Sequence, residues 1–228
     1  MPDIMKDRTL LFIILFSAVY IICNIESGSL STWDEAIYAN VSREILKTGD
    51  WIVLHQNGRA WFDKPPLYMW CTALSYKMLG INEFSTRLTS SLFGLATILL
   101  VYVFVRKICS KNAAILASLF LTALPHYLHF AKIGMLDVML TFFVTLMLYL
   151  FWLGQERPRY LLFSGLVFAL AYMTKGFAAV TGPAAIFIYC ALSRNFKPLF
   201  DRRFLAGIVF SLILICAWHT AQYMLAGR

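Results

Sequence analysis

Long apolar stretches bounded by polar or charged residues dominate the chain. They cover residues 9–23, 88–105, 113–130, 138–153, 160–173, 177–192 and 204–218. Apolar stretches of this kind predict membrane-spanning helices, although a bilayer core requires about 20 residues and the shorter stretches must extend into their flanks. Lys6 and Arg8 precede the first stretch and no small-residue cleavage site follows it, which favours a retained signal anchor. The pattern predicts about seven transmembrane helices.

Composition and charge support a membrane protein. The 228 residues are 60% hydrophobic and 14% charged, with a mean hydropathy of +0.70, which excludes an ordinary soluble domain. If the N-terminus is cytoplasmic, the cytoplasmic side carries eleven basic and four acidic residues, whereas the outer side carries nine and eight. This asymmetry is typical of the positive-inside rule, so the net charge of +8 does not indicate a nucleic-acid partner. The five cysteines form neither a disulfide framework nor a metal cage.

One long hydrophilic segment, residues 26–86, lies on the outer side in this topology. Thr32 to Glu35 fits a capping box, and Gly49 ends the helix that it starts. After an Asn57-Gly58 turn, residues 67–79 predict a second helix, closed by Gly80. We therefore expect a single membrane domain over residues 1–228: an all-α polytopic helix bundle whose outer loop carries amphipathic juxtamembrane helices.

Several charged residues of the outer side are candidates for chemistry. Asp34 and Glu35 share the first turn of the first loop helix, where the helix dipole favours carboxylates. Acidic residues are common in a first helical turn, where they stabilise the helix without any catalytic role. Lys64 precedes two prolines that fix its backbone, and Asp63 can pair with it, as in any loop ion pair. The other candidates lie at the ends of apolar stretches and are Lys132, Asp137 and Lys175.

These residues together suggest group transfer from a lipid phosphate. A carboxylate can accept the proton of an attacking hydroxyl while ammonium groups stabilise the departing phosphate. Lys175 could equally snorkel at a helix end, and Asp or Glu could hold a divalent cation. His126 and His129 lie three residues apart, but two histidines without a third ligand are more typical of polar groups at a membrane interface.

Two motifs of the outer loop resemble a known family. They read Trp33-Asp34-Glu35-Ala36-x-Tyr38-Ala39 and Phe62-Asp63-Lys64-Pro65-Pro66-Leu67, and Ala131-Lys132-x-x-x-Leu136-Asp137 and Thr174-Lys175-Gly176 follow further along. Their order and spacing are similar to the aminoarabinose transferase and dolichyl-phosphate-mannose protein mannosyltransferase-like family. The resemblance implies a GT-C fold and transfer of a sugar from a polyprenyl-phosphate carrier to an acceptor on the outer face, with inversion.

The resemblance also implies roles for individual residues. Asp34 would be the catalytic carboxylate, and Asp137 would act near the acceptor. The donor phosphate would contact Lys64, Lys132 and Lys175, and the supporting residues would be Glu35, Tyr38 and Asp63. No cofactor is certain, but Glu35 or Asp63 could hold a divalent cation. Ile37 departs from the family, because aminoarabinose transferases commonly have Arg there, and Asp63 stands where many members have Glu.

The resemblance places the chain in a bacterial inner membrane with its site on the periplasmic side. Its partners would be membrane lipids, the polyprenyl-phosphate-linked sugar, and a lipid, glycan or protein acceptor. Family members have about a dozen spans, so the chain resembles the N-terminal half of such a protein. Two alternatives stay open here: an incomplete fragment that binds the carrier without turnover, and a membrane transporter or scaffold.

Overall fold

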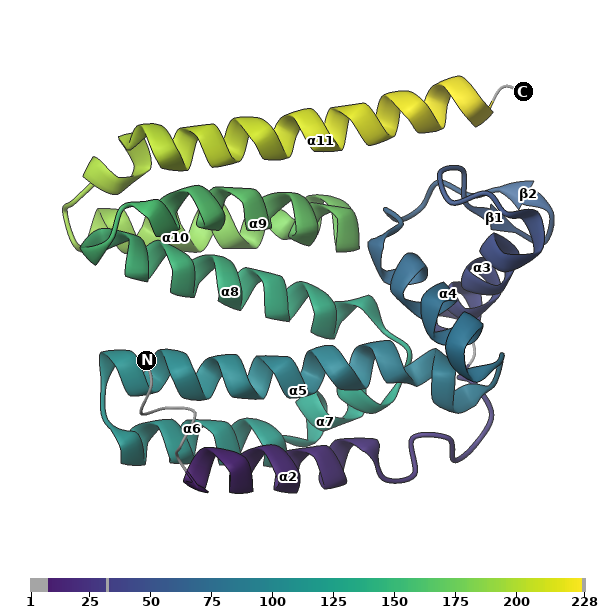
Figure 1. Ribbon diagram of the computed structural model, residues 1–228, viewed down its shortest axis with the longest axis horizontal. Coiled ribbons are helices and arrows are strands. Elements are labelled where there is room, and N and C mark those ends of the chain that lie inside the picture. Colours follow the sequence, from purple (N-terminus) through teal and green to yellow (C-terminus); the bar gives the residue numbers. More distant parts are fainter. Residues whose placement is uncertain (1–7, 32, 227–228) are drawn as a thin grey trace. The chain divides into compact units, whose positions relative to one another are not determined.

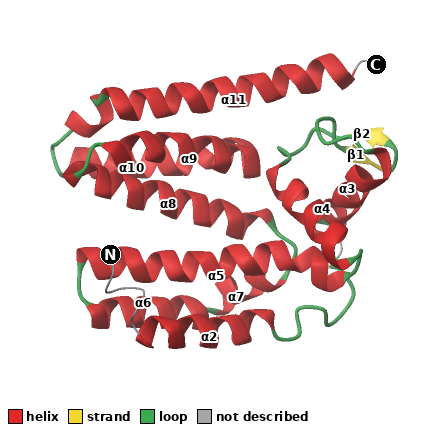
Figure 2. Ribbon diagram, viewed as in Figure 1, coloured by secondary structure: helices red, strands yellow, loops and turns green. Residues whose placement is uncertain are grey.

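The computed structural model describes residues 8–31 and 33–226, and helices dominate it (Figures 1 and 2). The α-helices are α2 (Arg8–Ile22), α3 (Asp34–Thr48), α4 (Leu67–Leu79), α5 (Glu83–Ile108), α6 (Lys111–Ala123), α7 (Pro125–Lys132), α8 (Leu136–Glu156), α9 (Arg159–Lys175), α10 (Thr181–Leu192) and α11 (Arg202–Ala226). Two short 3-10 helices, η1 (Gly176–Val180) and η2 (Lys197–Phe200), precede α10 and α11. The strands β1 (His55–Gln56) and β2 (Arg59–Ala60) form an antiparallel hairpin.

The apolar stretches of the sequence coincide with these helices, which confirms the all-α polytopic class. Four helical stretches are long and apolar enough to cross a membrane: Glu83–Ile108, Leu136–Glu156, Arg159–Leu192 and Arg202–Ala226. Helices α6 and α7 would make a fifth span, but they are bent by 63° at Pro125, which cannot continue the hydrogen bonding of α6. Predicted spans 160–173 and 177–192 fall within one helical stretch because η1 joins α9 directly to α10.

The outer loop contains the two predicted helices. Helix α3 ends just before Gly49 and α4 just before Gly80, and these glycines have φ angles of +73° and +79° that L-residues with side chains adopt at a cost. The loop itself ends earlier than predicted. Asn82 caps α5 by accepting a hydrogen bond from the Ser85 backbone N–H at 2.8 Å, so residues 83–86 belong to the helix.

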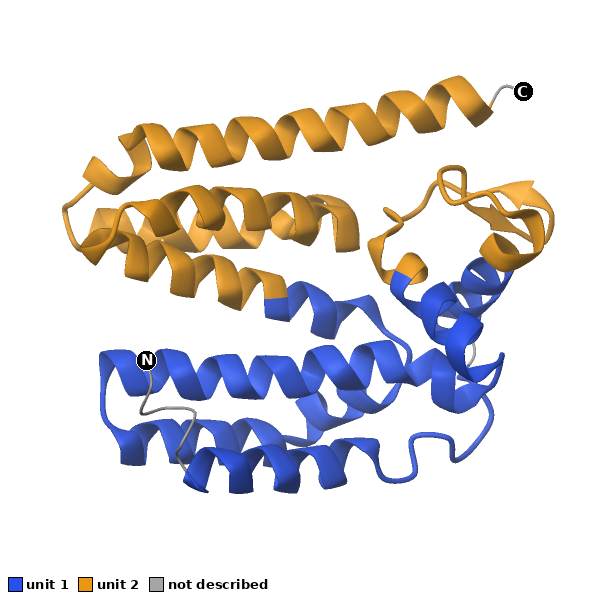
Figure 3. Ribbon diagram, in the orientation of Figure 1, with its two compact units in different colours: residues 1–43, 71–142 blue, residues 44–70, 143–228 orange. Residues whose placement is uncertain are grey.

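Unit 1, which comprises residues 1–43 and 71–142, packs α2, α6 and α7 against α5 (Figures 1 and 3). Its core contains Ile13 and Ile21 of α2 together with Ile98 and Tyr102 of α5. The Tyr127 hydroxyl inside this core is paired, since it donates to the Gly94 carbonyl at 2.8 Å. This pairing follows from the high free-energy cost of an unsatisfied polar group away from water.

Unit 2, which comprises residues 44–70 and 143–228, is organised around the long contact of α9 with α11 (Figure 3). Two glycines make this contact close: a Cβ added to Gly165 would lie 2.8 Å from the Gly207 Cα. The Ser211 hydroxyl of α11 donates to the Gly165 carbonyl at 2.8 Å. Small residues and a hydroxyl hydrogen bond are the usual means of holding membrane helices together.

Replacing Gly207 with Ala is expected to separate these two helices. The new Cβ would collide with the Leu162 carbonyl, which is backbone and cannot rotate away. Overpacking of this kind costs about 1–3 kcal/mol, so the purified variant should unfold at a lower temperature than the parent. Cys216→Ala, at an exposed position of the same helix, is the matched control and should unfold like the parent. Equal unfolding temperatures for both variants would contradict the close contact.

Candidate active site

A buried ion pair anchors the first turn of α3 to the start of α5. The Arg87 Nε donates to Glu35 Oε1 at 2.7 Å, and Arg87 Nη2 reaches Oε2 at 3.3 Å. The two side chains are 6% and 0% exposed. A bidentate guanidinium–carboxylate contact away from water fixes both the distance and the orientation of the two segments.

The Glu35 carboxylate accepts three further hydrogen bonds. The Gly134 N–H donates to Oε1 at 2.8 Å, while the backbone N–H and the hydroxyl of Ser31 donate to Oε2 at 2.6 and 2.9 Å. Burial alone raises the pKa of Glu35, but Arg87, Ser31 and Gly134 together lower it below its ordinary value of 4.5. Five donors saturate a carboxylate, so Glu35 does not fit the predicted alternative of a metal ligand.

Arg87 also organises the segment that precedes α3. Its guanidinium donates to the carbonyl oxygens of Ile25, Ser27, Gly28 and Ser29, at distances of 2.7 to 3.3 Å. We call Glu35, Arg87, Ser31 and Gly134 the Glu35–Arg87 clamp. The clamp joins three segments that are distant in sequence. They are the first turn of α3 with the residues just before it, the start of α5, and the connection between α7 and α8.

Asp34 lies beside the clamp but outside it. Its side chain is exposed, in contrast to the buried Glu35, because adjacent residues of a helix point in different directions. As the first residue of α3 it lies where unpaired backbone N–H groups stabilise a negative charge. Tyr38, one turn further, is 3% exposed and belongs to the buried face of α3. Thr32, the predicted capping residue, lies outside the described residues.

The connection between α7 and α8 carries two more of the predicted residues. The hydrogen bond from Gly134 to Glu35 places this connection against the start of α3, so Lys132 and Asp137 belong to the same unit as Asp34. The Lys132 Nζ donates to the Cys23 carbonyl at 3.2 Å and lies 5.7 Å from the centre of the Tyr20 ring. Asp137 is half-buried in the first turn of α8. Of the predicted site residues, unit 1 therefore holds Asp34, Glu35, Tyr38, Lys132 and Asp137.

Unit 2 holds Asp63, Lys64 and Lys175. A Cβ added to Gly176 would lie 3.8 Å from the Pro65 Cγ, so the turn after α9 packs against the loop of the two prolines. This contact brings the half-buried side chains Lys64 and Lys175 into the same region of the unit. The predicted pairing of Asp63 with Lys64 is wrong: within residues 33–226, no ion pair joins them, and Asp63 is exposed.

Sequence reasoning missed most of the clamp. Arg87 follows the predicted outer loop of residues 26–86 and counts only among the basic residues of the outer side, and neither Ser31 nor Gly134 is a predicted site residue. An arginine at the start of an apolar span was the available signal, since such a charge needs a partner. His126 and His129 are exposed on α7, and in the described part of the chain no group of three or more His, Cys, Asp or Glu side chains could hold a metal ion.

Residues 63–219 match the family model described as dolichyl-phosphate-mannose-protein mannosyltransferase. An uncharacterized protein of Aquifex aeolicus is 32% identical over 93% of this chain and 44% of its own length. The undecaprenyl phosphate-alpha-4-amino-4-deoxy-L-arabinose arabinosyl transferase of Aeromonas salmonicida is 28% identical over 92% of this chain and 40% of its own length. The chain thus spans less than half the length of these relatives.

Solved structures of ArnT from Cupriavidus metallidurans, in the apo state and bound to undecaprenyl phosphate, share the fold. Each superposes with a TM-score of 0.85 at 26% identity, over 94% of this chain and 41% of the ArnT chain. This agreement confirms the GT-C-like helix bundle that the outer-loop motifs implied, and the candidate spans make the chain an integral membrane protein.

Proposed function

The chain belongs to the dolichyl-phosphate-mannose-protein mannosyltransferase family, and we propose that it carries the catalytic outer loop of a membrane glycosyltransferase. The donor is a sugar linked to a polyprenyl phosphate, and the acceptor is a lipid, glycan or protein hydroxyl or amine. The observation that carries this proposal is an exposed carboxylate, Asp34, at the first turn of α3 on a segment fixed by the buried Glu35–Arg87 clamp. Undecaprenyl phosphate bound to the similar ArnT supports the choice of donor.

The proposed reaction is a single displacement at the anomeric carbon. The acceptor oxygen or nitrogen attacks this carbon, Asp34 accepts the acceptor's proton, and the bond from the anomeric carbon to the phosphate oxygen breaks. The polyprenyl phosphate leaves with the bonding electrons, and lysine ammonium groups stabilise its negative charge. Attack from the face opposite the leaving group inverts the anomeric centre. Asp137 is proposed to orient the acceptor, and Lys64, Lys132 and Lys175 are proposed to contact the phosphate.

The positive-inside asymmetry supports an orientation with a cytoplasmic N-terminus and the site on the periplasmic face of a bacterial inner membrane. A polyprenyl carrier keeps its chain in the bilayer, so its phosphate lies at interfacial depth. Label transfer from radiolabelled polyprenyl-phosphate sugars to endogenous acceptors, in membranes containing the chain, tests the proposal. Label should appear in product with inverted anomeric configuration; retained configuration would contradict a single displacement.

Replacing Lys64 with Ala is expected to weaken donor binding more than turnover. A charge-assisted contact with a phosphate contributes about 1.5–3 kcal/mol, so the KM for the polyprenyl-phosphate sugar should rise by about tenfold or more. Steady-state kinetics at varied donor concentration measures this effect. Lys47→Ala, at an exposed position in the last turn of α3, is the control and should keep the KM of the parent. An unchanged KM for Lys64→Ala would remove this residue from the donor site.

A further inference from the structure

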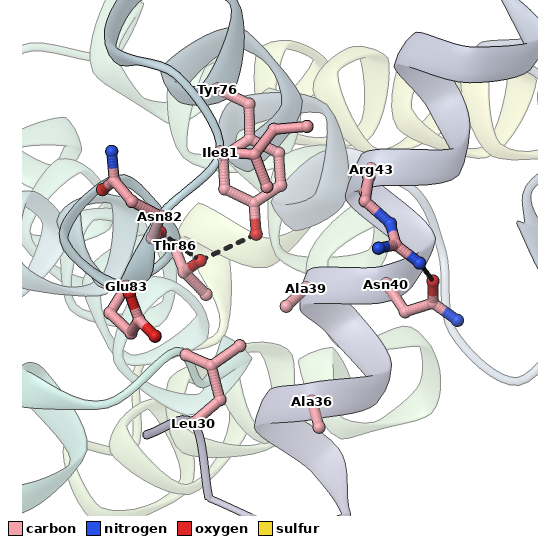
Figure 4. Close-up of a pocket in the computed structure, with 10 residues that line it drawn as sticks. All are labelled: Leu30, Ala36, Ala39, Asn40, Arg43, Tyr76, Ile81, Asn82, Glu83 and Thr86. Carbon is pink, nitrogen blue, oxygen red and sulfur yellow. Dashed lines mark hydrogen bonds between the residues drawn. The ribbon is translucent and has the colours of Figure 1, made fainter. Parts of the chain in front are cut away.

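Unit 1 contains an open pocket between α3, the end of α4 and the start of α5 (Figure 4). Its volume is about 320 Å³, within the usual range for small-ligand sites. Leu30, Ala36 and Ala39 supply an apolar wall, and Tyr76 and Thr86 share a hydrogen bond of 2.8 Å at its base. None of these residues has a role in the proposed sugar transfer.

The pocket carries one positive and one negative side chain on different walls. Figure 4 shows Arg43 on α3, with Glu83 across the pocket at the first residue of α5. Arg43 Nη2 donates to Asn40 Oδ1 at 2.9 Å, which orients the guanidinium. Burial raises the pKa of the Tyr76 hydroxyl between them, and the hydrogen bond with Thr86 lowers it. The nearby charges act in a lesser degree: Arg43 lowers this pKa, whereas Glu35 and Glu83 raise it. Arg43 and Glu83 are themselves exposed.

The pocket lies at the depth of lipid headgroups. Helix α5 has 26 residues and is one of the candidate spans. At 1.5 Å per residue it is about 39 Å long, which exceeds the bilayer's hydrocarbon core of about 30 Å. The two ends of α5 therefore reach the headgroup region, and Glu83 is the residue at one end.

Apolar side chains next to the pocket are exposed. Met78 is 80% exposed, Leu79 47% and Ile81 56%, and all three lie in the last turn of α4 or the connection to α5. Ile81 also lines the pocket itself (Figure 4). Exposed apolar residues beside a polar pocket at this depth suit acyl chains rather than water.

We propose that this pocket binds a phospholipid whose headgroup carries both a phosphate and a primary ammonium, as phosphatidylethanolamine does. The phosphate contacts Arg43, the ammonium donates to Glu83, and the acyl chains lie along Met78, Leu79 and Ile81. A purely anionic headgroup leaves Glu83 without a partner, and a quaternary ammonium cannot donate a hydrogen bond to it. The proposal concerns a lipid site separate from sugar transfer and does not depend on that function.

Lipid retention tests the proposal. The purified chain is equilibrated in mixed micelles with equal amounts of phosphatidylethanolamine, phosphatidylcholine and phosphatidylglycerol, and the bound lipids are counted by native mass spectrometry. We expect phosphatidylethanolamine to be enriched in the parent. Arg43→Gln and Glu83→Gln should each reduce this enrichment by about fivefold or more, since each removes one charge-assisted contact. Lys47→Gln and Glu26→Gln, at exposed positions outside the pocket, should retain it.

Three results would overturn the assignment. Equal enrichment in parent and pocket variants, each shown to be folded by its helical circular dichroism and melting temperature, would remove the lipid from this pocket. Preferential retention of phosphatidylglycerol would show that Glu83 takes no ammonium. Displacement of the lipid by an equal concentration of soluble glycerophosphoethanolamine would show that acyl chains contribute nothing and that the ligand is a free headgroup compound.

Discussion

Replacing Asp34 with Asn is expected to reduce sugar transfer by at least about 100-fold, the lower end of what a general base contributes. Asparagine has nearly the same size but cannot accept the proton of the attacking group. The side chain is exposed and lies outside the Glu35–Arg87 clamp, so folding should be unaffected. The rate of label transfer from the polyprenyl-phosphate sugar, normalised to the amount of folded protein, measures the effect.

Glu26→Gln is the matched control for this change. It also replaces an exposed acidic residue of the same loop by its amide, but it has no place in the proposed reaction. Its transfer rate should equal that of the parent. If Asp34→Asn transferred sugar at the parent's rate, Asp34 would only stabilise the N-terminus of α3, as acidic residues in a first helical turn commonly do. If both variants lost the same activity together with expression, the loop carboxylates would be structural.

Local rules predicted the framework of the outer loop well. Gly49 and Gly80 end the two predicted helices because each stands where the chain needs a positive φ. The exposed carboxylate and the loop of two prolines also lie on the predicted elements. These features depend on a few neighbouring residues, and a single sequence contains all of that information.

The clamp could not be predicted in the same way, because it joins residues 52 and 99 positions apart. The residues that neighbour Glu35 in the sequence do not indicate whether its side chain is a buried partner of Arg87 or an exposed carboxylate in the first turn of a helix. Most faces of the surrounding helices are apolar, so periodicity does not reveal which helix contacts which. The 63° bend at Pro125, by contrast, has a local cause in the proline itself.

Replacing Arg87 with Ala is expected to destabilise unit 1 by about 3–5 kcal/mol, the usual result of removing one partner of a buried ion pair. The change leaves the Glu35 carboxylate buried without its guanidinium and leaves the carbonyls of Ile25, Ser27, Gly28 and Ser29 without their donor. Thermal unfolding of the purified protein in detergent measures the loss. Arg59→Ala removes an exposed arginine of the outer loop and should unfold like the parent.

The pH dependence of the difference in unfolding temperature between the parent and Arg87→Ala identifies the cause of the destabilisation. In the parent, the lowered pKa of Glu35 means that the clamp stabilises the fold above about pH 4.5 and loses this contribution as the pH falls through the folded-state pKa. In Arg87→Ala the same carboxyl has no cation, so protonation removes an unpaired charge and favours the fold. The gap in unfolding temperature should therefore narrow as the pH falls below 4.5. If the difference in unfolding temperature stays constant with pH, lost packing rather than the buried charge accounts for the destabilisation. The Glu35–Arg87 contact would then orient the start of α3 without contributing electrostatic stability.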